Sequence, residues 1–211
     1  MTEPSTIAIA PNITEYFQEV ISDAIRARRV EATDAAATYL VSLLCSFTHP
    51  DEEAGSGFDR PLTFLLRDAM EAPPAERFRR LRALGDHSLY ALGFFGTHIE
   101  LRGGDRRYVS SIGSSAYTHA AAMLRTRVRP EVRTEARGER TPDVLSEMAA
   151  KFDRFASVLA DVAEGTLACG ARDERSVVKL YERWLKTGSS RLAGELGARG
   201  IVPTRGAGGT N

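Results

Sequence analysis

The sequence predicts an all-α protein, a single-domain helical bundle of about seven or eight helices. Apolar residues recur at intervals of three and four through most of the chain, which is the spacing of one face of a helix. Alternating apolar and polar residues, the pattern typical of strands, are almost absent. With 211 residues, of which 43% are hydrophobic and 27% charged, the chain can form one well-packed core.

Four helices are expected in the first half of the chain. Each is bounded by residues that start or stop helices, such as Asn12 with Glu15 three positions later, or the pair Pro73-Pro74. The fourth helix can also be divided in two at Gly85-Asp86, and the pattern leaves both alternatives open. The four helices cover about residues 12–30, 34–47, 61–72 and 75–95.

The second half is expected to begin with a connection over residues 96–105, which could hold a short extended piece at 98–101. A charged, solvated linker is expected at 125–140. The heptad spacing of apolar residues from Leu145 to Val162 indicates either the spine of the bundle or a dimer contact. Further helices are expected over about residues 106–127, 142–164, 174–187 and 190–196.

The helical domain is expected to cover residues 12–197. It lies between a flexible leader at 1–11 and a disordered, Gly-rich tail at 198–211. Small residues occupy the centres of two apolar faces, at Gly85 and Ser88 in one helix and around Gly113 in another. Because small side chains let helix axes approach closely, these two helices are expected to pack against each other.

Composition and charge exclude several classes of protein. The formal net charge is zero, so no general attraction to nucleic acid or to an anionic membrane is expected. The longest apolar stretch, residues 39–47, is too short to span a membrane, and the first residues do not form a signal peptide pattern. Two cysteines in apolar stretches fit a reducing compartment. A soluble, cytoplasmic protein is therefore expected.

No motif of an enzyme or of a cofactor site is present. The sequence lacks Glu-x-x-His, His-Glu-x-x-His and Cys-x-x-Cys, so no metal site is predicted. The glycine-rich segments are not followed by Lys-Ser/Thr, and no Gly-x-Ser-x-Gly elbow occurs. No catalytic residue and no cofactor are therefore predicted, and these observations favour a protein that is not an enzyme.

One polar cluster is a candidate ligand-binding site. Ser115 and His119 are four residues apart and can share one helical face, where a hydroxyl and an imidazole could form a hydrogen bond. If the helices over 75–95 and 106–127 pack together, these side chains and others would line a small polar cavity. The alternative is that the small residues only permit close packing. The candidate residues are His87, Ser88, Tyr90, Ser115 and His119.

Three stretches together resemble a family of bacterial all-helical proteins of similar length that has no assigned activity. They are the segment LGDHSLY at 84–90 leading into 93–95, the run from Tyr108 to Tyr117, and LYERWLKTG at 180–188. The resemblance covers roughly residues 12–190. It implies a helical fold and a bacterial origin, and it implies no activity, cofactor or catalytic residue.

Two functions are compatible with these observations. The absence of catalytic motifs and the charged segment at 125–140 favour a non-enzymatic regulatory or partner-binding helical protein, with a homodimer or another protein as partner. The alternative is a protein that binds a small molecule or cofactor, and could be an enzyme, in a cavity between the helices around 86–95 and 108–123.

Overall fold

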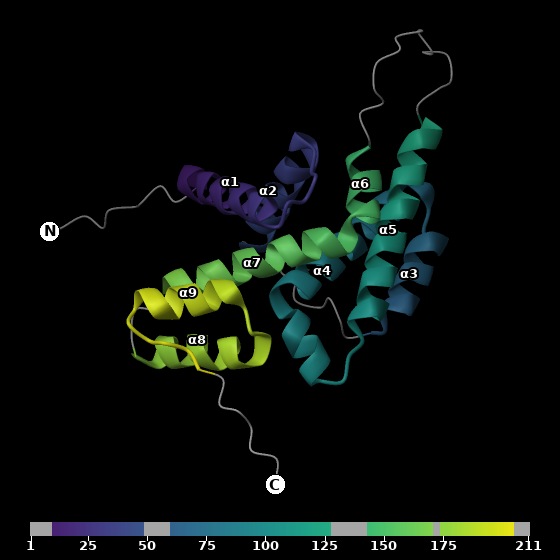
Figure 1. The fold of residues 1–211 in the computed structure, drawn as a ribbon. Helices are drawn as coiled ribbons and strands as arrows, with labels where there is room; N and C mark the ends of the chain where they lie inside the picture. Colours follow the sequence, from purple (N-terminus) through teal and green to yellow (C-terminus); the bar gives the residue numbers. More distant parts are fainter. Residues whose placement is uncertain (1–9, 49–59, 128–142, 171–173, 205–211) are drawn as a thin grey trace, which may run out of the picture. The chain divides into compact units, whose positions relative to one another are not determined.

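The computed structural model describes residues 10–48, 60–127, 143–170 and 174–204. All regular structure in these ranges is α-helical (Figure 1), so the predicted all-α fold is confirmed. Within these ranges the chain forms nine helices: α1 (Ala10–Ala27), α2 (Asp34–Thr48), α3 (Leu62–Glu71), α4 (Pro74–Leu101), α5 (Arg106–Arg127), α6 (Val144–Ala150), α7 (Phe152–Gly170), α8 (Glu174–Thr187) and α9 (Ser190–Ala198).

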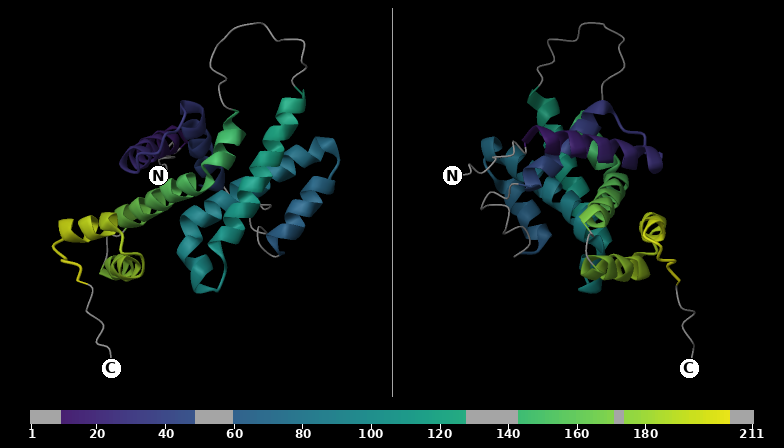
Figure 2. Two further views of the ribbon diagram at one scale, coloured as in Figure 1. Left: turned by 45° about the vertical axis from the view of Figure 1, so that its right-hand side comes forward. Right: turned by 90° about the vertical axis from the view of Figure 1, so that its left-hand side faces the viewer.

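The helices form two compact units, one up to residue 159 and one from residue 160. In the first unit, α4 and α5 pack against each other, as Figure 2 shows, and α3 contacts both. Helix α6 packs on α5 and α2, and α1 packs on α2. The expected single domain over 12–197 stays a prediction.

None of the described helices combines the length and the hydrophobicity that a membrane span requires.

The second unit has its own small core. Ser189 caps α9, since its hydroxyl accepts from the Leu192 amide, and it also donates to the buried Glu164 carboxylate at 2.6 Å. Ile201, in the segment expected to be a disordered tail, packs against this core. Its buried members come from α8 and α9: Leu180, Trp184, Leu192 and Leu196.

Helix α4 is one continuous helix. It passes through Gly85-Asp86 without a break and continues to Leu101, so the short extended piece expected at 98–101 is wrong. Gly85 is inside the helix because the Tyr117 ring of α5 lies against it, and a Cβ at Gly85 would be 2.7 Å from that ring. Two residues beyond Leu101, Gly103 has a φ of 76°, which is the left-handed conformation that closes a helix C-terminus.

The helix expected over 142–164 is broken into α6 and α7 at Lys151. No proline or glycine is at this point. The Lys151 ammonium instead donates to the Glu147 carboxylate and to the carbonyl of Glu31, before α2. The apolar heptad positions on both sides of the break are buried within the first unit, so they act as the spine of its core. These are Leu145, Met148, Phe152, Phe155 and Leu159.

The predicted close approach of α4 and α5 through small residues is confirmed at Gly113. A Cβ at Gly113 would lie 2.4 Å from Cζ of Phe152 and 2.7 Å from Cβ of Ser88. Both neighbours are buried. The crossing is therefore packed at this point, and only glycine leaves enough room for the Phe152 ring.

Candidate functional site

The predicted ligand-site residues on α4 lie on two different faces of that helix. His87 and Tyr90 face α2, where the Phe47 ring is stacked on Tyr90 at 4.1 Å between centroids and edge-on to His87 at 5.1 Å. The His87 ring nitrogen Nδ1 is 2.7 Å from the Ala83 carbonyl oxygen. Burial raises the pKa of Tyr90. These two residues thus belong to an aromatic cluster, which Phe94 extends at 4.6 Å from Tyr90.

Ser88 is separate from that cluster, at the crossing of α4 with α5. It is fully buried beside Gly113, and its hydroxyl has no hydrogen-bond partner among the described residues. Ser115 and His119 are half-buried on α5, and the described part of the structure shows no hydrogen bond between them. The structure brings His87 and Tyr90 together around Phe47 but gives no shared contact to all five residues. A ligand site formed by them stays a prediction.

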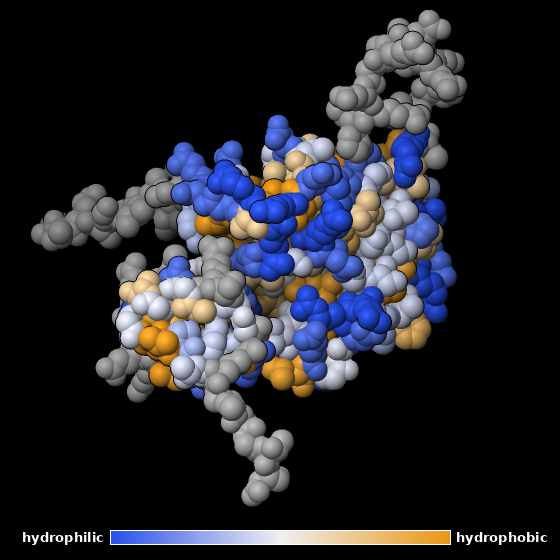
Figure 3. All heavy atoms as spheres, in the orientation of Figure 1, coloured by the Kyte–Doolittle hydropathy of each residue, from blue (hydrophilic) through white to orange (hydrophobic). Residues whose placement is uncertain are grey.

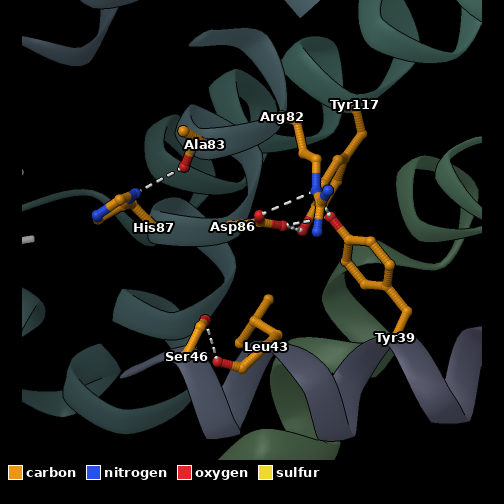
Figure 4. A network of polar contacts seen from close by, with 8 residues as sticks. All are labelled: Tyr39, Leu43, Ser46, Arg82, Ala83, Asp86, His87 and Tyr117. Carbon is orange, nitrogen blue, oxygen red and sulfur yellow. Dashed lines mark hydrogen bonds and ion pairs between the residues drawn. The ribbon is translucent and has the colours of Figure 1, made fainter. Parts of the chain in front are cut away.

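A partly buried polar network joins α2, α4 and α5, and Asp86 is at its centre (Figure 4). Its Oδ1 accepts hydrogen bonds from the hydroxyls of Tyr39 at 2.6 Å and Tyr117 at 2.7 Å. The Arg82 Nε donates to the Tyr39 hydroxyl at 3.1 Å and is 3.6 Å from the other oxygen of Asp86. The His87 ring points away from this network, toward the Ala83 carbonyl, so it forms no hydrogen bond with Asp86.

The protonation of this network follows from its burial. Burial raises the pKa of Asp86, while the hydrogen bonds from Tyr39 and Tyr117 and the charge of Arg82 oppose the change. Burial and the neighbouring carboxylate raise the pKa values of both tyrosines. Both tyrosines therefore stay protonated at neutral pH and donate to Asp86. The network ties three helices together, which is a structural role.

The sequence indicates only part of this network. The hypothesis of a polar cavity includes Asp86 and Tyr117 on the two facing helices, but it gives no contact between them, and Tyr39 counts only as part of an apolar stripe. One signal was available, since Arg82 and Asp86 are four residues apart on one helix. No sequence signal pairs Tyr39 with Asp86, because the two residues are 47 positions apart.

An apolar groove lies in the first unit between α3, the last turns of α4 and the start of α5. Its cavity volume is about 670 Å³. Phe95 is 51% exposed and Tyr108 is 38% exposed. Large apolar side chains that are exposed together in a concave surface are typical of a binding site. The groove is lined by Arg60, Pro61, Leu62, Ala91, Phe95, His98, Ile99, Arg102, Gly104, Asp105, Tyr108 and Val109.

Contacts between helices hold the walls of the apolar groove in place. The Tyr108 hydroxyl of α5 accepts from the Thr63 amide at 3.0 Å and is 2.7 Å from the Thr63 hydroxyl. It thereby caps α3, whose N-cap residue Pro61 offers no side-chain hydrogen bond. Gly104 lets the chain fold back on Ile99, because a Cβ at Gly104 would be 2.9 Å from the Ile99 carbonyl oxygen. The groove is thus largely preformed.

The rim of the apolar groove is positively charged. Arg102 makes no ion pair within the described residues, whereas Arg60 is paired with Asp68 at 2.9 Å. The Asp105 carboxylate accepts from the Arg107 amide at 2.8 Å at the start of α5. Arg102 therefore remains the cation at this rim that can pair with a carboxylate of a bound molecule.

Among the described residues, no group of three or more His, Cys, Asp or Glu side chains is arranged to hold a metal ion. The comparisons with known proteins give no further guidance: no protein-family model matches the chain, and neither the curated proteins nor the solved structures include a match. The resemblance to the bacterial helical family stays a prediction.

Proposed function

We propose that this protein is a non-enzymatic, partner-binding helical protein, and that the apolar groove binds an amphipathic helix of a partner protein. The observation that carries this proposal is the exposure of Phe95 and Tyr108 in a concave, preformed apolar surface. Burying such side chains against a partner is favourable by about 25 cal/mol per Å² of apolar area. Aromatic residues in a groove are also the usual centres of binding energy at protein interfaces.

The chemistry of the groove specifies the partner segment. Its apolar floor, with Phe95, Ile99 and Val109, fits apolar side chains spaced three or four residues apart on a helix. The polar groups of the groove are at its rim. They would therefore contact residues that flank the apolar face of a partner helix, and they would not orient a small polar molecule inside the groove. Arg102 favours an acidic residue at that edge. The expected partner segment is therefore an amphipathic helix with acidic flanking residues.

A cytoplasmic location is part of the same proposal. Cys45 is a free thiol on α2, with its sulfur 3.7 Å from the hydroxyl of Thr14. A free cysteine that packs as a small apolar residue fits a reducing compartment.

The test compares two exposed phenylalanines. Partners that co-purify with the protein are identified, and the affinity of a synthetic helix from the partner is then measured with purified protein. We expect Phe95→Asp to weaken binding at least tenfold, as loss of a central aromatic contact does. Phe64→Asp is the matched control, because Phe64 is 44% exposed on α3 but does not line the groove. Both variants should keep the melting temperature of the parent.

Two results would contradict the proposal. The first is equal affinity of the parent and Phe95→Asp for the partner helix. The second is a homodimer, detected by light scattering, that Phe95→Asp converts to a monomer, because the groove would then serve self-association.

A further inference from the structure

A second groove, which we call the basic groove, lies on the first unit and is lined by the residues that follow α1, the first half of α5 and the junction of α6 and α7. It consists of two adjoining pockets of about 690 and 340 Å³, and both are lined by Arg154 and Ser157. The larger pocket is also lined by Leu92, Arg106, Arg107, Ser110, Ser111, Ser114, Ala149, Ala150, Lys151, Phe152 and Asp153. The smaller pocket adds Arg28, Arg29 and Val30. Figure 3 shows hydrophilic residues gathered around the end of α7 nearest α6.

Positive charge is concentrated in this groove, although the whole chain has no net charge. Cations line both pockets, and the one carboxylate among the lining residues is Asp153. That carboxylate accepts a hydrogen bond from the Ser110 hydroxyl at 2.5 Å. The local excess of cations therefore does not follow from a basic composition of the chain. It favours the binding of an anion in this groove.

Three of the arginines are available to a ligand. Arg29, Arg107 and Arg154 are exposed and make no ion pair within the described part of the chain. By contrast, Lys151 binds the Glu147 carboxylate at 3.0 Å, and Arg106 is 3.6 Å from Glu100. The three available arginines come from three separate segments, after α1, in the first turn of α5 and in the first turn of α7.

Arg29 has an unfavourable backbone conformation. Its φ is 51°, and it is the only described residue other than glycine with a positive φ. The Val30 amide donates to the Ile25 carbonyl and the Arg29 amide to the Arg26 carbonyl, which places Arg29 where helices that end this way usually have glycine. A side chain at this position costs stability, because its Cβ is crowded in the left-handed conformation. Strain of this kind is typical of functional positions.

Hydroxyl groups on α5 complete the lining. Arg107, Ser111 and Ser114 recur at helical spacing on the face that lines the larger pocket. The Ser114 hydroxyl donates to the Ala149 carbonyl at 3.0 Å, whereas Ser111 is exposed and makes no hydrogen bond with described residues. Ser111 can therefore donate to a ligand held by Arg107.

We propose that the basic groove binds a small molecule with at least two phosphate groups. Arg107 and Ser111 would hold one phosphate in the larger pocket, and Arg29 with Arg154 would hold the second. Phosphate fits better than carboxylate because the planar guanidinium forms paired hydrogen bonds with it, and a phosphate has three free oxygens for donors from several segments. This site is separate from the apolar groove and does not depend on the function proposed for it.

The test uses inorganic tripolyphosphate and inorganic phosphate as probes, with affinities measured by calorimetry at low salt. We expect tripolyphosphate to bind at least tenfold more tightly than phosphate, because it reaches both pockets. Arg154→Gln should weaken tripolyphosphate binding about tenfold, as expected for the loss of one charge-assisted contact. Arg79→Gln is the matched control, since Arg79 is exposed on α4 and lines neither pocket, and its affinity should equal that of the parent.

Two substitutions of Arg29 distinguish an effect on ligand binding from an effect on folding stability. Arg29→Gly and Arg29→Ala both remove the guanidinium, so both should weaken tripolyphosphate binding about tenfold. Only glycine relieves the backbone strain, so Arg29→Gly should raise the melting temperature by roughly 2–4 °C, whereas Arg29→Ala should not. A variant that folds more stably and binds less tightly cannot have lost binding through unfolding.

Three outcomes would overturn the proposal. One is unchanged affinity in both Arg154→Gln and Arg29→Gly. Another is an equal loss in Arg79→Gln, which would indicate non-specific charge attraction. The third is tighter binding of a short single-stranded oligonucleotide than of tripolyphosphate at the same salt concentration, which would make the groove a nucleic-acid site.

Discussion

Replacing Gly113 by alanine should destabilise the protein, although the same change usually stabilises a helix. Alanine in a helix interior is favoured over glycine by about 1 kcal/mol. At Gly113, however, the new Cβ would be 2.4 Å from the Phe152 ring and 2.7 Å from the Ser88 Cβ. The Ser88 Cβ moves only with the backbone of α4. Overpacking of a core costs about 1–3 kcal/mol, and we expect a cost near the upper limit. The net loss of unfolding free energy is then about 1–2 kcal/mol.

The assay is urea denaturation followed by far-UV circular dichroism, with Gly194→Ala as control. Gly194 is in α9, and a Cβ there would meet nothing within 4 Å. This control should therefore gain up to about 1 kcal/mol. Combining Gly113→Ala with Phe152→Leu should cost less than the sum of the two changes, because the smaller side chain relieves the overlap. If Gly113→Ala is as stable as Gly194→Ala, the helices do not approach closely and the reasoning is wrong.

Two further predictions concern pH, both measured as the free energy of unfolding of variant and parent at several pH values. Because Asp86 has a raised pKa in the folded state, its ionisation should lower stability as the pH rises from about 3.8, and Asp86→Asn should remove this decrease. Burial by itself would raise the pKa of Glu147, but hydrogen bonds from Thr33 and Lys151 lower this pKa by more, so it is lowered in the folded state. The stabilisation that ionised Glu147 gives to the folded state should be complete above about pH 4.5 and disappear as the pH falls through the folded-state pKa. The Glu147→Gln variant should lack this pH-dependent stabilisation. For either substitution, a plot of unfolding free energy against pH that runs parallel to that of the parent would contradict the prediction.

The all-α fold could be predicted because helix formation is largely local. The spacing of apolar residues and the capping residues act within a few positions of each other. The helix expected over 190–196 is thus found as α9, with Ser189 as its cap. The helix expected over 106–127 is found with the same bounds as α5. Glycine at 113, next to other small residues on one helical face, also indicated the close crossing of α4 and α5, since small side chains let helix axes approach closely.

Other features depend on contacts between distant segments, so no local pattern predicts them. Gly85 looks like a helix break, but the Tyr117 ring packed against it keeps α4 continuous. Nothing near Lys151 in the sequence indicates a helix end, and its bonds to Glu147 and the Glu31 carbonyl form only after α6 packs near α2.

The two grooves likewise depend on the tertiary structure. Zero net charge predicts no general attraction to nucleic acid or to an anionic membrane, and it gives no sign that the arginines at 29, 107 and 154, from three segments, line one groove. Most of the helical segments can be predicted from residue patterns, because hydrogen bonds and side-chain spacing within a helix are local. Which helix ends meet, and therefore where apolar surface and positive charge are concentrated, depends on packing between segments that are far apart in the sequence.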